Sequence, residues 1–216
     1  MKIDATFVRS AVSAQDFPRD STAEIAVVGR SNVGKSMLIN ALVRRRVART
    51  SAAPGKTRLA NIYRVVRDGA APLYLVDLPG YGYARGRDAA HDFDEVTRAY
   101  FGRVGRVIAA LLLVDARHPG LESDIAAWHW LRESVDDAQI AATKIDKLAH
   151  GERIRAMREL ESVFQHPVAP VSAFTGEGLD ELWKVIDRLA NNNSSSLPRR
   201  RRNRQRPETA RRRLKN

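Results

Sequence analysis

The chain has 216 residues, no cysteine and a formal net charge of +12 at pH 7. Its length suffices for one α/β domain with a sizeable core, and the lack of cysteine excludes disulfides, thiolate metal sites and a cysteine nucleophile. The charge is uneven, because residues 197–216 carry a net +9 and leave only +3 for the rest. We therefore expect a nearly neutral folded domain followed by a strongly basic tail.

The first residues, MKIDATFVRSAV, contain neither a long apolar core nor a small-residue cleavage site, so a signal peptide is not expected. The longest apolar run, at 107–114, is far below the ~20 residues that cross a bilayer. The sequence thus predicts a soluble, cytoplasmic protein.

Residues 1–22 have mixed character, and we expect a short N-terminal extension anchored by Phe7, Val8 and Phe17. Beyond it, short runs rich in β-branched residues predict strands, and apolar residues at helical spacing predict helices. The predicted strands are 24–28, 59–67, 73–76, 107–114, 140–142 and 168–171, and the predicted helices are 37–43, 93–104, 121–135, 154–164 and 179–189.

The turn at Asp68-Gly69 joins two adjacent strands, which must therefore run antiparallel. The remaining strands alternate with helices, which indicates parallel pairing with helices on both faces. We expect a three-layer α/β domain at 23–190 with a mostly parallel six-stranded sheet and one antiparallel edge strand. Residues 191–216 are rich in asparagine, serine and arginine, which predicts a disordered basic tail.

A glycine-rich stretch, Gly29-Arg30-Ser31-Asn32-Val33-Gly34-Lys35-Ser36, lies between the first predicted strand and helix. It has the G-x-x-x-x-G-K-S form of a phosphate-binding P-loop. Glycines let the backbone approach an anion, and the helix N-terminus adds about half a positive charge. Lys35 is expected to reach the β- and γ-phosphates, and the Ser36 hydroxyl to bind Mg²⁺. The flanking strand and helix argue against a chance match on a glycine turn.

Asp77-Leu78-Pro79-Gly80 follows the predicted strand 73–76 directly. A carboxylate at this place can hold Mg²⁺, and a glycine three residues later can donate its N–H to a γ-phosphate. The D-x-x-G pattern alone also fits a simple turn. A magnesium-binding threonine is expected in the preceding loop, where Thr57 is the favoured candidate and Thr50 the alternative.

Thr143-Lys144-Ile145-Asp146 ends the strand at 140–142 and has the form [N/T]-K-x-D. Its aspartate can accept hydrogen bonds from the ring N–H and the exocyclic amine of guanine, a donor pair that adenine lacks. Ser172-Ala173 follows the last strand, where the Ala173 N–H could meet the guanine O6. A helix-capping role for Asp146 is the simpler alternative.

The ordered set GRSNVGKS, PGKTR, DLPGYG, TKID and SAFTGEG resembles the TRAFAC-class GTPases of the Era/TrmE branch, and most nearly the EngB (YihA/YsxC) family. The resemblance extends over about residues 23–190. It implies a magnesium-dependent GTPase that acts in assembly of the large ribosomal subunit, with ribosomal RNA as partner and a link to cell division and septation.

The motifs and the resemblance together predict the site residues. Catalytic roles are expected for Lys35, Thr57, Gly80 and Asn32, and magnesium contacts for Ser36, Thr57 and Asp77. The predicted nucleotide contacts are Gly29, Arg30, Ser31, Asn32, Val33, Gly34, Lys35, Ser36, Gly55, Lys56, Thr57, Arg58, Leu59, Asp77, Leu78, Pro79, Gly80, Thr143, Lys144, Ile145, Asp146, Val171, Ser172 and Ala173.

Tyr81 occupies the position where many signalling GTPases carry a water-orienting glutamine, a task that an aromatic side chain cannot perform. We therefore expect hydrolysis at or below the ~10⁻⁴ s⁻¹ scale of unassisted small GTPases. In related GTPases an asparagine at the place of Asn32 helps to hold potassium, which gives the hypothesis of a K⁺ ion here. A loop-bracing amide is the alternative.

The basic tail lacks interleaved aromatic residues, so it is expected to bind phosphate backbones without reading sequence. A solubilising tail is the alternative. We expect a monomeric nucleotide-dependent switch. The competing hypotheses are an RNA-binding protein whose nucleotide site only regulates docking, and a metabolic P-loop kinase, which Asp146 and the lack of an acceptor-substrate lid argue against.

Overall fold

A computed structural model describes residues 2–49, 59–82, 95–103 and 108–195. The strands are β1 (Ile3–Ala11), β2 (Ala23–Gly29), β3 (Ala60–Arg67), β4 (Leu73–Asp77), β5 (Ile108–Asp115), β6 (Asp137–Thr143) and β7 (Val168–Pro170). The helices are α1 (Lys35–Val43), α3 (Glu95–Phe101), α4 (Glu122–Ser134), α5 (His150–Phe164) and α6 (Leu179–Ser195), with 3-10 turns η1 (Ala14–Asp16) and η2 (Ile145–Lys147).

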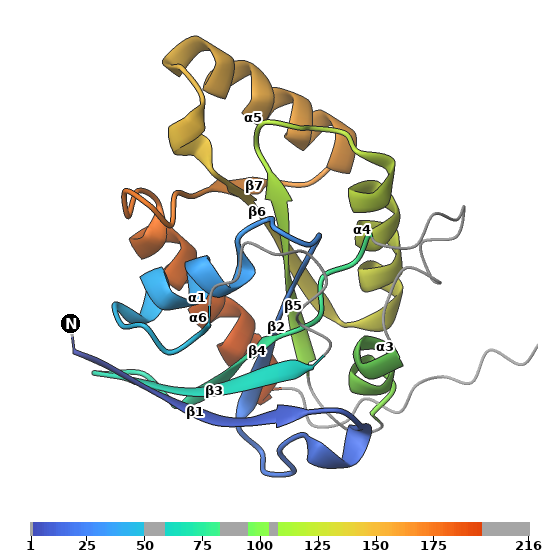
Figure 1. Cartoon of the computed structure of the whole chain (residues 1–216), viewed down its shortest axis with the longest axis vertical. Helices are drawn as coiled ribbons and strands as arrows, with labels where there is room; N and C mark the ends of the chain where they lie inside the picture. Colours follow the sequence, from blue (N-terminus) through green and yellow to red (C-terminus); the bar gives the residue numbers. More distant parts are fainter. Residues whose placement is uncertain (1, 50–58, 83–94, 104–107, 196–216) are drawn as a thin grey trace, which may run out of the picture.

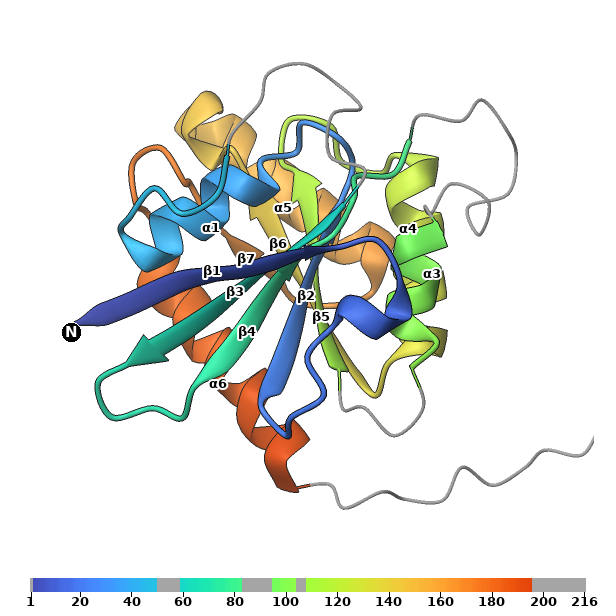
Figure 2. The same cartoon turned by 60° about the horizontal axis from the view of Figure 1, so that its bottom comes forward.

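In the part of the chain that the structure describes, one sheet joins seven strands in the order β1-β3-β4-β2-β5-β6-β7, and helices cover both of its faces (Figures 1 and 2). The pairs from β4 to β7 are parallel, whereas β3 runs antiparallel to both β1 and β4. The predicted mostly parallel α/β sheet is confirmed, with seven strands in place of six. The reversed strand β3 lies one position inside the edge.

The additional strand comes from the segment predicted to be an N-terminal extension, since β1 pairs with β3 along most of its length. Within β1 only Ala5 and Ala11 are buried, so the apolar alternation that marks a strand is missing. Phe17 is buried as expected, at 2% exposure, and the ring of Phe7 lies 5.8 Å from that of Tyr63 on β3, but neither Phe7 nor Val8 is buried. They are 48% and 39% exposed because an edge strand leaves much of its surface uncovered.

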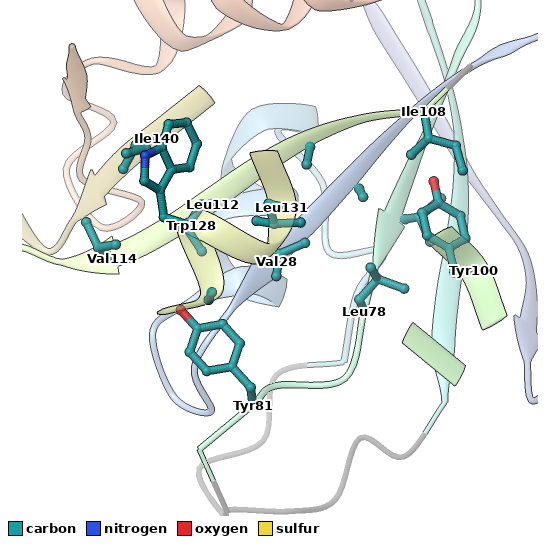
Figure 3. Packing of buried hydrophobic residues seen from close by; sticks show 14 of the residues in the cluster. Val28, Leu78, Tyr81, Tyr100, Ile108, Leu112, Val114, Trp128, Leu131 and Ile140 are labelled. Carbon is teal, nitrogen blue, oxygen red and sulfur yellow. The ribbon is translucent and has the colours of Figure 1, made fainter. Parts of the chain in front are cut away.

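Two hydrophobic cores lie on opposite faces of the sheet, and β5 contributes to both. Leu112 and Val114 face a cluster with α3, α4 and α5, whereas Leu111 and Leu113 face a cluster with α1 and α6. Figure 3 shows the first cluster, where Trp128 of α4 lies among strand residues. Every residue of β5 is buried, as expected for a central parallel strand covered on both faces.

Several boundaries differ from the sequence prediction. The strand predicted at 140–142 extends over seven residues as β6, because the ladder to β5 supplies pairing partners that its own composition does not reveal. Helix α6 continues to Ser195, so the first five residues of the predicted tail are helical. Residues 196–216 lie outside the described residues. In the described part of the chain, no helix is both long and apolar enough to span a membrane.

Candidate nucleotide-binding site

The predicted P-loop connects β2 to α1, as the sequence pattern indicated. Strand β2 ends at Gly29, and α1 begins at Lys35. Gly34 caps the helix with φ 111°, a left-handed conformation that side chains disfavour. The first N–H groups of α1 have no carbonyl partner within the helix, so this end of the loop can donate to an anion.

Long side chains fix the carbonyl groups of the P-loop. The Lys35 Nζ donates to the carbonyl oxygens of Gly29 at 2.9 Å and Arg30 at 3.2 Å. Lys144 Nζ lies 2.7 Å from the Asn32 carbonyl oxygen, so the T-K-x-D segment holds the P-loop directly. This contact joins two predicted motifs that are 112 residues apart in the sequence.

Thr143 makes a second link between the same two motifs. Its buried hydroxyl lies 2.9 Å from the Val33 carbonyl oxygen and 3.1 Å from that of Val114. Because Thr143 is the last residue of β6 and Lys144 follows it directly, the P-loop is fixed relative to the end of that strand. The Thr143 hydroxyl therefore binds backbone carbonyl groups of the protein.

A polar group forms where α1 begins and β4 ends: Lys35 and Asp77 are buried, and Ser36 is partly exposed. The Ser36 hydroxyl donates to Asp77 Oδ2 at 2.7 Å. Burial lowers the pKa of Lys35 and raises that of Asp77, while the attraction between the two charges opposes both shifts. Asp77 Oδ1 is buried and has no hydrogen-bond partner among the described residues. Such an orphaned carboxylate oxygen is suited to a cation or a bound water.

Gly80 lies directly against the P-loop. A Cβ built at this position would come within 2.7 Å of the Ser31 backbone nitrogen and Oγ, so only glycine fits without a shift of the loop. The Ser31 N–H donates to the carbonyl oxygen of Tyr81 at 3.2 Å. The predicted D-x-x-G segment and the P-loop are therefore in contact.

Asp146 and Ser172 meet at the ends of β6 and β7, where a base was predicted to bind. The Ser172 hydroxyl donates to Asp146 Oδ1 at 2.6 Å, and this bond lowers the pKa of Asp146. The Ser172 Oγ in turn accepts the N–H groups of Phe174 and Thr175, which shapes the loop around Ala173. The carboxylate is thus ionised and held in place.

Several predicted contact residues have buried side chains. Their side chains lie in the cores or are otherwise buried, so only their backbone groups can reach a nucleotide; these residues are Val33, Leu78, Pro79, Ile145 and Val171. Leu59, just before β3, is 38% exposed. Gly55, Lys56, Thr57, Arg58 and the alternative Thr50 lie outside the described residues.

Asn32 has an exposed side chain and φ 63°, a backbone conformation that asparagine tolerates. Among the described residues its amide group has no hydrogen-bond partner, so the bracing alternative gains no support in this part of the chain. Its carbonyl oxygen is the group that holds the loop in place, through Lys144.

The sequence prediction missed Asp115, the last residue of β5. Asp115 Oδ2 lies 2.9 Å from Lys144 Nζ, and the Arg117 guanidinium holds the same carboxylate at 2.8–2.9 Å. Although burial raises the pKa of Asp115, the hydrogen bonds from Arg117 and Lys144 bring it well below its usual range. Its position at the end of a buried strand, the signal that identified Asp77, could have revealed it.

Asp124 was also missed. It lies in the first turn of α4, where it accepts hydrogen bonds from the side chains of Arg30 and Tyr81. No sequence signal marks it, because acidic residues are common in the first turn of a helix.

Three features meet at the carboxyl edge of the parallel strands: a P-loop, an aspartate that ends the neighbouring strand and a T-K-x-D segment. They are the features of a P-loop GTPase domain. A family model described as 50S ribosome-binding GTPase matches residues 24–144. The probable GTP-binding protein EngB of Heliobacterium modesticaldum is 40% identical over 194 residues, which cover 87% of this chain and 93% of that relative.

A second EngB, from Chlorobaculum tepidum, is 41% identical over 85% of this chain and 95% of its own length. The chain belongs to the EngB family of GTP-binding proteins and carries its GTPase domain.

Solved structures agree with this fold. A crystal structure of a probable GTP-binding protein engB matches with a TM-score of 0.59 and 25% identity, covering 78% of this chain and 99% of that one. Era in complex with MgGDPNP and nucleotides 1506–1542 of 16S ribosomal RNA matches with a TM-score of 0.65 and 24% identity, covering 79% and 57%. The Era likeness concerns the fold alone.

Proposed function

We propose that this protein is a slow GTPase whose nucleotide state switches its binding to a precursor of the large ribosomal subunit. The observation that carries the proposal is the meeting of the phosphate and base segments at one edge of the sheet. Lys144 contacts the P-loop carbonyl of Asn32, and Asp146 of the same segment is ionised and bound to Ser172. A single guanine nucleotide can then contact both groups.

The choice of guanine rests on Asp146. An ionised carboxylate is acceptor-only, and two of its acceptor sites can receive the ring N–H and exocyclic amine of guanine. The hydrogen bond from Ser172 fixes the orientation of the carboxylate before a base arrives. Adenine has no matching donor pair, so GTP is preferred over ATP.

The residues present fit a magnesium ion. Asp77 Oδ1 is buried without a partner among the described residues, and the Ser36 hydroxyl lies beside the same carboxylate. Bound Mg²⁺ keeps several waters and takes only one or two carboxylates with substrate phosphates. No cluster of three or more His, Cys, Asp or Glu side chains occurs in the described ranges, which suits this mode.

Ser36 and Asp77 would hold the ion, together with the predicted Thr57. When bound, it neutralises charge that develops between the β- and γ-phosphates. Lys35, buried beside Asp77, would contribute a fixed positive charge at the same place.

Slow hydrolysis is supported by the position of Tyr81. Its side chain is 2% exposed, and its hydroxyl donates to Asp124 at 2.7 Å. A buried phenol that is already bonded cannot orient an attacking water. We therefore propose a rate at or below the ~10⁻⁴ s⁻¹ scale of unassisted small GTPases until a partner supplies the missing group.

A potassium ion beside Asn32 is a further part of this proposal. Asn32 is exposed and its amide has no hydrogen-bond partner among the described residues, so its side-chain oxygen is available as a ligand. Single-turnover hydrolysis should be faster in K⁺ than in Na⁺, and Asn32→Ala should remove the difference. Equal rates in the two salts for the unaltered protein would contradict a role for potassium.

The ribosomal role rests on the matched family, described as 50S ribosome-binding, and on the net charge of +9 in residues 197–216. Such a basic segment binds phosphate backbones through counterion release. We place the protein in the cytoplasm as a monomer. The alternative is an RNA-binding protein whose nucleotide site only regulates docking.

Co-sedimentation with large-subunit precursors tests the proposal. Binding is compared with GDP and with a non-hydrolysable GTP analogue, at about 50 and 200 mM salt, where phosphate contacts weaken steeply. We expect the protein to bind the precursor more strongly with the GTP analogue than with GDP. In Asp146→Asn, binding to the precursor should not depend on which nucleotide is added. Equal binding with both nucleotides and without nucleotide would contradict the switch, and would favour the plain RNA-binding alternative.

A further inference from the structure

The carboxylate of Asp124 joins two loops of the nucleotide site that are far apart in the sequence. Its Oδ1 accepts the Tyr81 hydroxyl at 2.7 Å and the Arg30 Nε at 3.0 Å. Arg30 belongs to the P-loop, and Tyr81 directly follows the D-x-x-G segment. These two hydrogen bonds join protein groups to each other, and they are separate from the contacts to a nucleotide that the motifs predict for these loops.

The carboxylate is buried, with a side chain that is 2% exposed, and it has two sources of compensation. The Arg30 guanidinium supplies a positive charge, and the N-terminus of α4 adds a favourable dipole because Asp124 lies in its first turn. Burial raises the pKa of Asp124, whereas the bonds from Tyr81 and Arg30 oppose the rise. A buried group with several partners fixes their relative positions.

The backbone of the same two loops is also joined. The Ser31 N–H donates to the Tyr81 carbonyl oxygen, and residues 30 and 81 form a parallel bridge. Gly80 touches Ser31 so closely that no Cβ would fit. The Tyr81 ring is buried in the core that Figure 3 shows. Gly80 is therefore held next to the P-loop by its own contact with Ser31 and by the backbone and side chain of the residue that follows it.

We propose that Asp124 is a positioning residue that, through Tyr81 and Arg30, favours GTP over GDP. The inference rests on the proposed nucleotide site, in which the Gly80 N–H donates to the γ-phosphate. A donor already held beside the P-loop does not have to be ordered when the triphosphate binds, which lowers the entropic cost of binding. GDP has no γ-phosphate, so it gains nothing from this arrangement.

The test compares two tyrosine variants that each lose one hydroxyl bonded to an aspartate. Tyr81→Phe removes the bond to Asp124, whereas the control Tyr74→Phe removes a 2.9 Å bond to Asp20 away from the P-loop. Affinities for GDP and for a non-hydrolysable GTP analogue are measured by titration. We expect Tyr81→Phe to lower the affinity for the GTP analogue about tenfold, which is the scale of one hydrogen bond to a charged group. Its affinity for GDP should fall less than about twofold.

The control should leave the ratio of the two affinities unchanged. Asp124→Asn keeps the shape of the side chain but loses its charge, and it should lower the affinity for the GTP analogue relative to that for GDP. Urea unfolding confirms that each variant is folded. An equal loss for both nucleotides, or a gain for the analogue, would overturn the positioning role while leaving the proposed function intact. If the unaltered protein binds neither nucleotide, the proposed function fails and this inference fails with it.

Discussion

The candidate site has a phosphate end, formed by the P-loop with Lys35 and Asp77, and a base end with Asp115 and Asp146. The charged groups at the two ends are stabilised in different ways. At the phosphate end, Lys35 and Asp77 are 8% and 1% exposed, and burial shifts the pKa of each toward its neutral form. At the base end, hydrogen bonds from neighbouring side chains keep Asp115 and Asp146 ionised and lower their pKa values.

This difference follows from the ligand that each end is proposed to meet. A phosphate and its cation bring charges that compensate a buried lysine and aspartate, so the phosphate end tolerates groups whose charges are only partly compensated by the protein. A neutral base brings none, and the base end must satisfy its carboxylates from within the protein. Lys144 connects the two ends, because it binds both Asp115 and the P-loop.

The largest effect is expected from Lys35→Ala, which removes the buried positive charge of the phosphate end. GTP, GDP and their analogues should all bind at least about 100-fold more weakly, since several hydrogen bonds to charged groups are lost. Nucleotide titration measures the change, with Lys184→Ala, an exposed lysine paired with Glu181, as the control. A loss below fivefold would mean that the phosphate end does not bind phosphate.

Asp146→Asn tests the base end, and its effect should depend on the base. We expect GTP to bind about 100-fold more weakly, because a charged acceptor of two hydrogen bonds is lost. Xanthosine triphosphate should gain, since xanthine has a carbonyl where guanine has its amine and the asparagine NH₂ can donate to it. Competition titration with GTP, ATP and xanthosine triphosphate distinguishes this pattern from the base-independent loss expected for Lys35→Ala. Unchanged base preference would exclude Asp146 from the site.

Gly80→Ala tests how tightly the phosphate end is assembled. The new Cβ would lie 2.7–2.8 Å from Ser31 atoms, including its backbone, so the free energy of unfolding should fall by about 1–3 kcal/mol. Urea unfolding provides the measurement. Gly151→Ala is the control, because a Cβ there meets only Arg155 at 3.7 Å in α5 and should be neutral or stabilising. Equal stability of the two variants would show that residue 80 is less confined than described.

Acid should act on the two ends with opposite sign, and this is the smallest effect. The pKa of Asp115 is lowered by folding, so its stabilisation is present above its unfolded value of 3.8 and is lost as the pH falls below about 4. The pKa of Asp77 is raised, so protonation of Asp77 favours the folded state as the pH falls.

Urea unfolding between about pH 7 and 3 measures both contributions. Asp115→Asn should flatten the acid loss of stability, whereas Asp77→Asn should steepen it. Asp180→Asn, on the exposed side of α6, controls for the loss of one acidic group. Changes of the same sign for Asp77 and Asp115 would contradict the comparison.

The parts of the site that the sequence predicted are those governed by local rules. Apolar runs ending in Gly29, Asp77 and Thr143 place these residues at strand ends, and parallel strands bring such ends to one edge of the sheet. A glycine was needed at position 34 for its positive φ. These statements depend on neighbouring residues in the chain, so periodicity and turn chemistry suffice for them.

Contacts between distant segments were decided only by the tertiary structure. Arg30 and Asp124 are 94 residues apart, and neither has a local pattern that distinguishes it from a solvated charge. Strand β1 exists because β3 offers it hydrogen bonds, although only two of its nine side chains are buried. The motifs can therefore be recognised from short segments of the sequence. The edge strand β1 and the contacts of Asp124 with Arg30 and Tyr81 depend on pairing between distant segments, which a local pattern does not encode.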